Sequence, residues 1–264
     1  MDAFKARAVV ITGAAGGIGA ALARAFAARG ARLALADLDE EGLARLATGL
    51  EREGVELLTQ VTDVSRPESV EALAKICEQR LGGIEVVCNN AGVATAGELA
   101  GASLEDWRRT LDVNLWGVIH GIRAFVPRLI ARGPGGAVLN TASMAGLVGM
   151  QGLGVYSASK FAIVGLSEAL YRELRPYGVH VSVLCPMMVD TPMARNSLRV
   201  ASGDAVPVPS DFAGRLIEPE EVARRALHGL ERHQLYILTH PEQRPILQRR
   251  AARLEAVFEA EAWL

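Results

Sequence analysis

The chain has 264 residues, a length that suits one or two domains. Half of its residues are hydrophobic and 22% are charged, which excludes a disordered chain and indicates a globular protein with a sizeable core. Its 28 basic and 30 acidic side chains leave a net charge of −2, so there is no surplus of positive charge to hold a nucleic acid.

The spacing of the 3 cysteines and 5 histidines is not that of a metal site, so we expect no metal. An odd cysteine count without a CxxC pair indicates a reducing compartment, and we expect a cytoplasmic protein. Charged residues before the first apolar run predict a strand start and not a signal peptide. The longest uncharged stretch, 133–159, is rich in glycine and polar residues, which favours a buried strand and loop over a membrane span.

In chain order, short apolar runs alternate with long segments of helical periodicity. This alternation predicts an α/β fold: a doubly wound, mostly parallel sheet of about seven strands in a three-layer Rossmann arrangement. The runs expected to be strands buried on both faces are Ala8–Ile11, Arg32–Ala36, Val55–Val61, Ile84–Cys88, Ala137–Asn140 and Val179–Leu184. The expected helices are Gly17–Arg29, Asp39–Arg52, Pro67–Leu81, Leu104–Ala131 and Tyr156–Arg175.

The rhythm changes in the last third of the chain. Residues 186–217 carry four prolines and no clear period, which is typical of a lid over a binding site. A helix opened by Glu218–Glu221, a strand at Leu235–Leu238 and an amphipathic C-terminal tail at 241–264 follow. We expect a single domain, 1–264, whose tail docks on its own subunit or on a neighbour through the stripe Leu247, Ala251, Leu254 and Phe258.

A glycine-rich turn, Thr12–Gly19, joins the first predicted strand to the first helix. Glycines permit positive φ and let backbone N–H groups approach a pyrophosphate, and the helix N-terminus adds partial positive charge. The spacing differs from GxGxxG, and a tight turn without a ligand is the alternative interpretation. The candidate cofactor-binding residues in this turn are Gly13, Gly17, Ile18 and Gly19.

The second predicted strand leads into Asp37, where a carboxylate can accept hydrogen bonds from ribose hydroxyls. A carboxylate there repels a 2′-phosphate, and neighbours Ala14, Ala15 and Leu38 supply no cation, so the sequence favours NAD over NADP. Two alternatives remain: Asp39 could fill the same role, or Asp37 could be an ordinary surface residue.

Tyr156 and Lys160 lie four residues apart, which places them on one face of a helix. A free tyrosine has a pKa near ~10, and a nearby ammonium and an oxidised nicotinamide would lower it toward that of a usable base. Ser143 follows the strand that ends at Asn140, at the sheet edge where α/β folds bind ligands. The alternative is a packed tyrosine beside a solvated lysine.

Together these motifs resemble the short-chain dehydrogenase/reductase family, in its single-domain, NAD-preferring branch, over residues 4–240. Thr12–Gly19 is similar to the family's TGxxxGxG turn, and Asn89–Gly92 resembles its NNAG segment, which stabilises the central sheet and lies along the cofactor. Asp63–Val64 resembles the pair that holds the adenine. The resemblance adds the cofactor-binding candidates Asp63, Val64, Asn90, Ala91 and Gly92.

Asn114 falls where the family carries a catalytic asparagine, and with Ser143, Tyr156 and Lys160 it is similar to the family's catalytic tetrad. The resemblance implies that Asn114 helps to hold a water that links Lys160 to solvent. Without the other three residues, the simpler interpretation is a buried asparagine that stabilises a helix.

The resemblance also places Pro186, Val189 and Thr191 near the nicotinamide carboxamide. The match is imperfect here, because the family has Pro-Gly after this strand and this chain has Met187. A side chain at Met187 narrows the room beside the nicotinamide, so the contacts of Val189 and Thr191 are less secure than the tetrad.

The implied function is NAD-dependent oxidation of an alcohol or reduction of a ketone, with Tyr156 as general acid or base, in a homodimer or homotetramer formed through 104–131 and 156–175. A non-catalytic nucleotide-binding regulator is the alternative, although a regulator needs no complete tetrad. A nucleotide-sugar epimerase or dehydratase would need a larger C-terminal domain.

Apolar side chains near the tetrad favour an apolar secondary alcohol or ketone as substrate. For each of them, packing of the lid is an equally good interpretation, and Arg195 and Arg199 could face either a carboxylate or water. The loop after the serine contributes Met144, Leu147, Val148, Met150 and Leu153. The lid contributes Met187, Met188, Met193, Leu198, Val206, Val208, Phe212 and Leu216.

Overall fold

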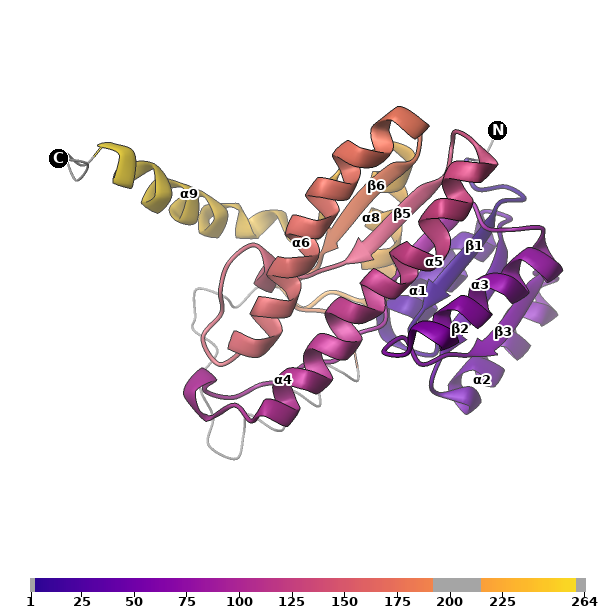
Figure 1. Cartoon of the computed structure of the whole chain (residues 1–264), viewed down its shortest axis with the longest axis horizontal. Helices are drawn as coiled ribbons and strands as arrows, with labels where there is room; N and C mark the ends of the chain where they lie inside the picture. Colours follow the sequence, from indigo (N-terminus) through magenta and orange to yellow (C-terminus); the bar gives the residue numbers. More distant parts are fainter. Residues whose placement is uncertain (1–2, 192–214, 260–264) are drawn as a thin grey trace.

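Seven parallel strands form the centre of the computed structural model, which describes residues 3–191 and 215–259 (Figure 1). Their order is β3-β2-β1-β4-β5-β6-β7, and every neighbouring pair is parallel, which confirms the predicted doubly wound sheet. The order reverses between β1 and β4, so a ligand crevice is expected at their carboxyl ends. The strands are β1 Ala8–Thr12, β2 Arg32–Asp37, β3 Leu57–Val61, β4 Val86–Asn89, β5 Ala137–Thr141, β6 His180–Cys185 and β7 Tyr236–Leu238.

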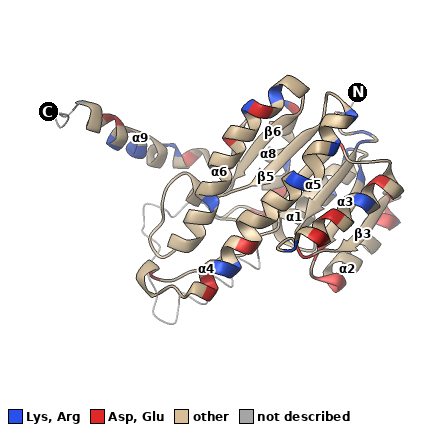
Figure 2. Ribbon diagram, viewed as in Figure 1, with Lys and Arg blue, Asp and Glu red and all other residues tan. Residues whose placement is uncertain are grey.

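Helices cover both faces of the sheet (Figure 1). Side chains alternate along β1, so Val9 and Ile11 pack in one core with α1, α2 and α8, while Ala8 and Val10 pack in the other with α3, α5 and α6. Most Lys, Arg, Asp and Glu side chains lie on the helices, and β5 and β6 carry none of these four residue types (Figure 2). The α-helices are α1 Gly17–Ala28, α2 Glu40–Arg52, α3 Pro67–Leu81, α4 Leu104–Leu111, α5 Gly117–Arg132, α6 Gly154–Leu174, α8 Pro219–Glu231 and α9 Arg244–Glu259.

One predicted strand is not buried on both faces. The five residues of β1 are all buried, whereas Thr59 and Val61 of β3 are exposed. The prediction of a doubly buried β3 is therefore wrong, because β3 lies at the edge of the sheet and has a single neighbouring strand. Its apolar run does not reveal its place in the strand order.

The predicted helix Leu104–Ala131 is interrupted by a π-helical turn at Asp112–Trp116, which separates α4 from α5. Such a turn accommodates an extra residue in the helical ladder and is common at functional sites. Asn114 lies in this turn and is fully buried. Apolar periodicity is nearly the same on either side of one inserted residue, so the sequence pattern does not show the interruption.

The C-terminal helix α9 leaves the body of the molecule (Figure 1). Ile246 is buried, and the guanidinium of Arg250 lies 5.6 Å from the ring centre of Phe161 on α6. Leu254 and Phe258 are 53% and 76% exposed, so the apolar stripe is not buried against the described part of its own chain. Docking on a neighbouring subunit stays a prediction. No helix within residues 3–191 and 215–259 combines the length and apolar character that a membrane span requires.

Candidate active site

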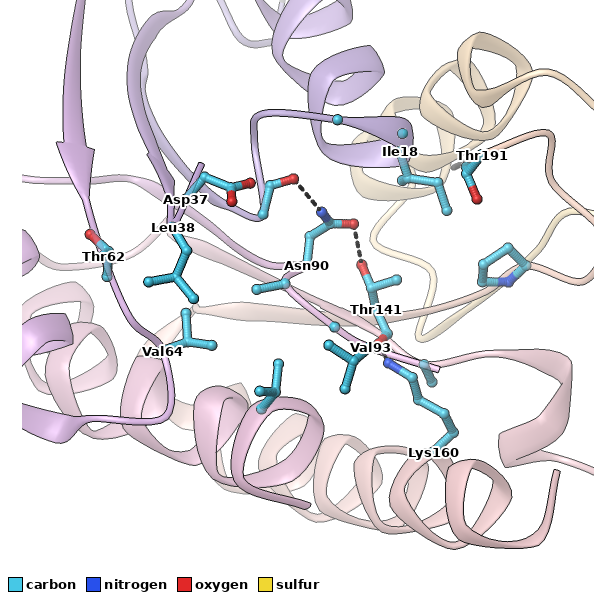
Figure 3. Close-up of a pocket in the computed structure, with 18 of the residues that line it drawn as sticks. Ile18, Asp37, Leu38, Thr62, Val64, Asn90, Val93, Thr141, Lys160 and Thr191 are labelled. Carbon is cyan, nitrogen blue, oxygen red and sulfur yellow. Dashed lines mark hydrogen bonds between the residues drawn. The ribbon is translucent and has the colours of Figure 1, made fainter. Parts of the chain in front are cut away.

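A cavity of about 380 Å³ opens at the carboxyl edge of the sheet, within the size range of small-molecule sites (Figure 3). The structure brings thirteen of the predicted site residues to its wall: Gly13, Gly17, Ile18, Asp37, Asp63, Val64, Asn90, Ala91, Gly92, Tyr156, Lys160, Pro186 and Thr191. Seven further lining residues were not predicted: Gly16, Leu38, Thr62, Val93, Val113, Thr141 and Ala142. Thr62 and Thr141 carry a usable signal, because each lies at the carboxyl end of a predicted strand.

The glycine turn leaves no room for a side chain at Gly13 or Gly19. Gly13 has φ +66°, and a Cβ there would lie 2.7 Å from Cα of Ala91. A Cβ on Gly19 would lie 1.9 Å from the carbonyl oxygen of Gly13. Gly16, the N-cap of α1, faces open space and offers no side-chain acceptor to the first N–H groups of the helix. The turn therefore presents backbone and a helix N-terminus to the cavity, which fits a pyrophosphate group.

Asp37 and Asp39, the two candidates for the ribose contact, have different hydrogen-bond partners. Asp37, the last residue of β2, accepts hydrogen bonds from the backbone N–H groups of Ala15 at 2.9 Å and Asp39 at 3.1 Å, and it lines the cavity. Asp39 caps α2 by accepting from Gly42 N at 2.9 Å, and its other oxygen lies 3.7 Å from Arg45. Because Asp39 is used as a cap and does not line the cavity, the geometry favours Asp37 as the ribose ligand.

Asp63 and Val64 follow β3 and line the same end of the cavity. The Asp63 carboxylate accepts from the backbone N–H of Ser65 at 2.9 Å and from its hydroxyl at 2.6 Å. Leu38 and Val64 supply apolar surface across from one another (Figure 3). These apolar and polar side chains suit the binding of a flat heterocyclic base that has apolar faces and a polar edge.

Two adjacent asparagines hold the strand ends together. The amide of Asn89 donates to Oδ1 of Asn140 at 2.9 Å, which joins β4 to β5 inside the sheet. The amide of Asn90 donates to the Gly13 carbonyl at 3.3 Å, and its oxygen accepts from the Thr141 hydroxyl at 3.2 Å (Figure 3). Asn90 thus fixes the glycine turn relative to the end of β5.

Tyr156 and Lys160 project from one face of α6, as predicted. Lys160 is 4% exposed, and its Nζ donates to the Thr141 carbonyl at 2.9 Å and lies 5.6 Å from the centre of the Tyr156 ring. Gly92 lies beside it, since a Cβ there would be 3.6 Å from Lys160 Nζ and 3.2 Å from Asn114 Oδ1. The structure therefore brings Asn114 close to Lys160 and Tyr156, which line the cavity.

Asn114 and Ser143 do not line the cavity. The Asn114 amide donates to the Val93 carbonyl at 2.9 Å and to the Ser159 hydroxyl at 3.0 Å. Ser143 is 7% exposed; its hydroxyl donates to the Pro186 carbonyl at 3.3 Å, and it shares a side-chain hydrogen bond with Tyr156. Ser143 therefore contacts Tyr156 directly, and Asn114 contacts the same helix at Ser159, between Tyr156 and Lys160.

Burial shapes the protonation of this pair. It raises the pKa of Tyr156 above its usual value, and the hydrogen bond with Ser143 acts in the opposite direction. Burial also lowers the pKa of Lys160 to about 8. The protein on its own therefore keeps the phenol protonated, and the predicted lowering of the tyrosine pKa requires a further positive charge at the site.

Some predicted residues lie elsewhere. Gly19 is buried behind the turn, and Val189 is 4% exposed in the core, where it forms a parallel bridge with Ile217. Met144 is 2% exposed, so it is a core residue and not part of a substrate pocket. None of Leu147, Val148, Met150, Leu153, Met187, Met188 and Leu216 lines the cavity. Met193, Arg195, Leu198, Arg199, Val206, Val208 and Phe212 lie outside the described residues.

No group of three or more histidine, cysteine or acidic side chains within the described part of the chain is arranged to hold a metal ion. The three cysteines are free and buried.

Comparison with known proteins gives consistent matches. The sequence profile of the short chain dehydrogenases matches residues 7–200. A 1-deoxy-11-beta-hydroxypentalenate dehydrogenase of Streptomyces exfoliatus is 43% identical over 219 residues, which cover 81% of this chain and 80% of the relative.

Two solved structures carry nicotinamide cofactors. A short-chain dehydrogenase/reductase from Burkholderia phymatum in complex with NAD superposes with a TM-score of 0.88 at 35% identity, over 97% of this chain and 96% of the other. A short-chain dehydrogenase from Sphingobium yanoikuyae in complex with NADPH superposes with a TM-score of 0.80 at 28% identity, over 96% of each chain.

Proposed function

This chain belongs to the short-chain dehydrogenase/reductase family, and from that premise we propose that it is an NAD(H)-dependent oxidoreductase. It transfers a hydride between the nicotinamide and an apolar secondary alcohol or ketone. The observation that supports this most directly is the Tyr156 ring held 5.6 Å from the buried Lys160 ammonium, on the wall of a cavity that begins at the glycine turn.

The residues along the cavity suit the parts of a dinucleotide in order. Backbone at the glycine turn holds the pyrophosphate, Asp37 accepts from the ribose hydroxyls, and Asp63 and Val64 hold the adenine. Nicotinamide, when bound, supplies the hydride donor or acceptor. Asn90, Ala91 and Gly92 would lie along the cofactor, and Pro186 and Thr191 would lie toward its carboxamide. Val189 would act there only through the backbone, because its side chain is buried in the core.

The chain's own residues move the proton. The Tyr156 oxygen takes a proton from the substrate hydroxyl during oxidation, or returns one to the ketone oxygen during reduction. To donate a hydrogen bond to the same substrate oxygen, the Ser143 hydroxyl would turn away from the Pro186 carbonyl. Lys160 stabilises the phenolate, and its pKa of about 8 lets it exchange a proton near neutral pH. Asn114 holds a water that links Lys160 to solvent.

The buried lysine also weighs against the alternative of a nucleotide-binding regulator without turnover. An ammonium that is 4% exposed and has no carboxylate as a hydrogen-bond partner among residues 3–191 and 215–259 costs folding free energy. A regulator gains nothing from that cost, whereas a proton-transfer site requires it. The regulator remains the second candidate, and the activity test below separates the two.

Asp37 supports the choice of NAD, because its carboxylate lines the cavity where a 2′-phosphate would meet it. The name of the Streptomyces exfoliatus relative, a dehydrogenase of a hydroxylated compound, supports an alcohol as substrate. We also propose a single domain that forms a homodimer or homotetramer through α4, α5 and α6. The free, buried cysteines support a cytoplasmic setting.

The test is a panel of secondary alcohols with NAD and NADP, followed by absorbance of the reduced cofactor, for wild type, Tyr156→Phe and Tyr171→Phe. Tyr171 lies in the same helix and packs on the core away from the cavity, so it is the matched control. Loss of an acid/base group lowers kcat by about 10²–10⁴-fold, and we expect this for Tyr156→Phe alone. Oxidation that survives unchanged in Tyr156→Phe contradicts the assignment.

A further inference from the structure

His240 is a buried histidine that none of the family motifs includes. It follows β7 at the N-cap of the short helix Pro241–Gln243, and it is 2% exposed. Both ring nitrogens have partners. Nδ1 lies 3.3 Å from Met187 N and 2.7 Å from the Thr239 hydroxyl oxygen, and Nε2 lies 3.2 Å from the Met188 carbonyl oxygen and 3.0 Å from the Arg215 carbonyl oxygen.

These contacts fix the tautomer of the ring. A backbone N–H can only donate, so Nδ1 must accept from Met187; a carbonyl can only accept, so Nε2 must carry the proton that it shares between Met188 and Arg215. His240 is therefore neutral, with its proton on Nε2. Every polar atom of the ring is used, and all three backbone partners belong to segments that flank the cavity wall.

The partners of His240 lead directly to the active site. Met187 follows Pro186, which lines the cavity and whose carbonyl accepts from the Ser143 hydroxyl at 3.3 Å and from Met144 N at 2.8 Å. The N–H held by His240 and the carbonyl that positions Ser143 therefore belong to one planar peptide group, that between Pro186 and Met187.

A short parallel bridge joins the segment after β6, residues 187–190, to a second segment, residues 215–217. Asp190 N donates to the Ile217 carbonyl at 2.9 Å, and Ile217 N donates to the Met188 carbonyl at 3.1 Å. Through Arg215, His240 holds this second segment as well, so a single ring joins both arms of the bridge to the end of β7.

We propose that His240 is a positioning residue of the active site: it fixes the backbone at Met187 and Met188, and thereby Pro186 and Ser143 at the nicotinamide end of the cavity. The proposal rests on the proposed function. An apolar side chain of similar size fills the same volume but leaves the half-buried Met187 N–H without its acceptor. Met187 stands where the family has glycine, so its backbone position depends on this contact and not on a tight glycine turn.

The test compares His240→Leu, which removes both polar functions, with His240→Asn, whose amide oxygen can replace Nδ1 as acceptor for Met187. Wild type and both variants are titrated with NADH by its fluorescence, and the KM for the alcohol and kcat are measured. For His240→Leu we expect the Kd for NADH and the KM to rise about tenfold, and His240→Asn to recover most of that loss. Hydrogen exchange at the Met187 amide should accelerate in His240→Leu only.

Ser182→Ala is the control for general destabilisation. Its buried hydroxyl donates to the Gln234 carbonyl at 2.7 Å. This bond joins β6 to the residues before β7 and lies away from the cavity. This variant should lower the unfolding temperature and leave the Kd and KM unchanged. The proposal is overturned if His240→Leu binds NADH and exchanges the Met187 amide like wild type, or if His240→Asn behaves like His240→Leu. A wild type that binds NADH but oxidises no alcohol defeats the proposed function alone, because the binding and exchange contrasts still decide the role of His240.

Discussion

The two ends of the cavity reach their geometry in different ways. At the glycine-turn end, the important groups are backbone atoms and a strand-end carboxylate; Gly13 and Gly19 pack against the main chain, and Asp37 accepts from two nearby N–H groups. At the tyrosine end, the groups are buried side chains, with Lys160 and Asn114 bonded to carbonyls of β5 and of the segment after β4.

The glycine-turn end therefore depends on the shape of the backbone, and the tyrosine end depends on the protonation of side chains. The glycine-turn end depends on the absence of Cβ atoms, and no buried proton is exchanged there. The tyrosine end depends on groups that burial displaces from their usual pKa, upward for Tyr156 and downward to about 8 for Lys160. Added volume should therefore disturb the first end, and a change of pH should disturb the second.

The largest effect is expected from added volume at Gly19. A methyl group there would lie 1.9 Å from the Gly13 carbonyl oxygen, which the surrounding turn holds in place, so Gly19→Ala should lower the free energy of unfolding by at least about 4 kcal/mol. Gly16→Ala is its matched partner, because nothing lies within 4 Å of the added Cβ and the backbone, at φ −153° and ψ 172°, suits any residue.

For Gly16→Ala we expect a stability within about 0.5 kcal/mol of wild type but weaker binding of NADH, since Gly16 lines the cavity. Urea unfolding and NADH titration measure the two quantities. Equal destabilisation by both substitutions would show that the turn does not depend on the close approach at Gly19.

Much of the fold and of the glycine-turn end could be predicted from the sequence, because the signals are local. The spacing of Gly13, Gly17 and Gly19 between a strand and a helix, and Asp37 at the end of the next strand, are visible within a few dozen residues. Each predicted strand begins and ends within two residues of the observed one, since apolar runs bounded by turn residues define the strands.

The remainder depends on contacts between distant parts of the chain. His240 contacts Met187 at a sequence separation of 53 residues, and Lys160 reaches the Thr141 carbonyl through the packing of α6 on β5. The π-turn around Asn114 is stabilised by Val93 and Ser159, neither of which is near it in sequence. The order of residue types along the chain does not show which distant residues come into contact.

The second prediction uses pH at the tyrosine end. Lys160 has a pKa of about 8 when folded and near 10.5 when exposed, so below pH 8 it is protonated in both states and the cost of its burial is fully present. Between pH 8 and 10.5 the unfolded state binds more protons, so stability rises with pH by about 3 kcal/mol from this group.

Lys160→Met lacks this contribution, and all other titrating groups are shared. The stability advantage of Lys160→Met over wild type should therefore shrink by about 3 kcal/mol between pH 7 and pH 11, as measured by urea unfolding. A difference that stays constant across this range would show that Lys160 is not buried as a charged group.

The smallest expected effect is at Asp37, and it tests which aspartate reads the cofactor. Asp37→Asn keeps the size of the side chain and removes the negative charge from the cavity wall, which relieves repulsion of a 2′-phosphate. We expect the ratio of kcat/KM for NADP over NAD to rise about tenfold, which corresponds to about 1.4 kcal/mol. Asp39→Asn is the matched control, because asparagine also caps helices well and Asp39 does not line the cavity. Its cofactor ratio should stay at the wild-type value. A shift in Asp39→Asn without one in Asp37→Asn would transfer the ribose contact to Asp39, and the cap of α2 would then have to open when the cofactor binds.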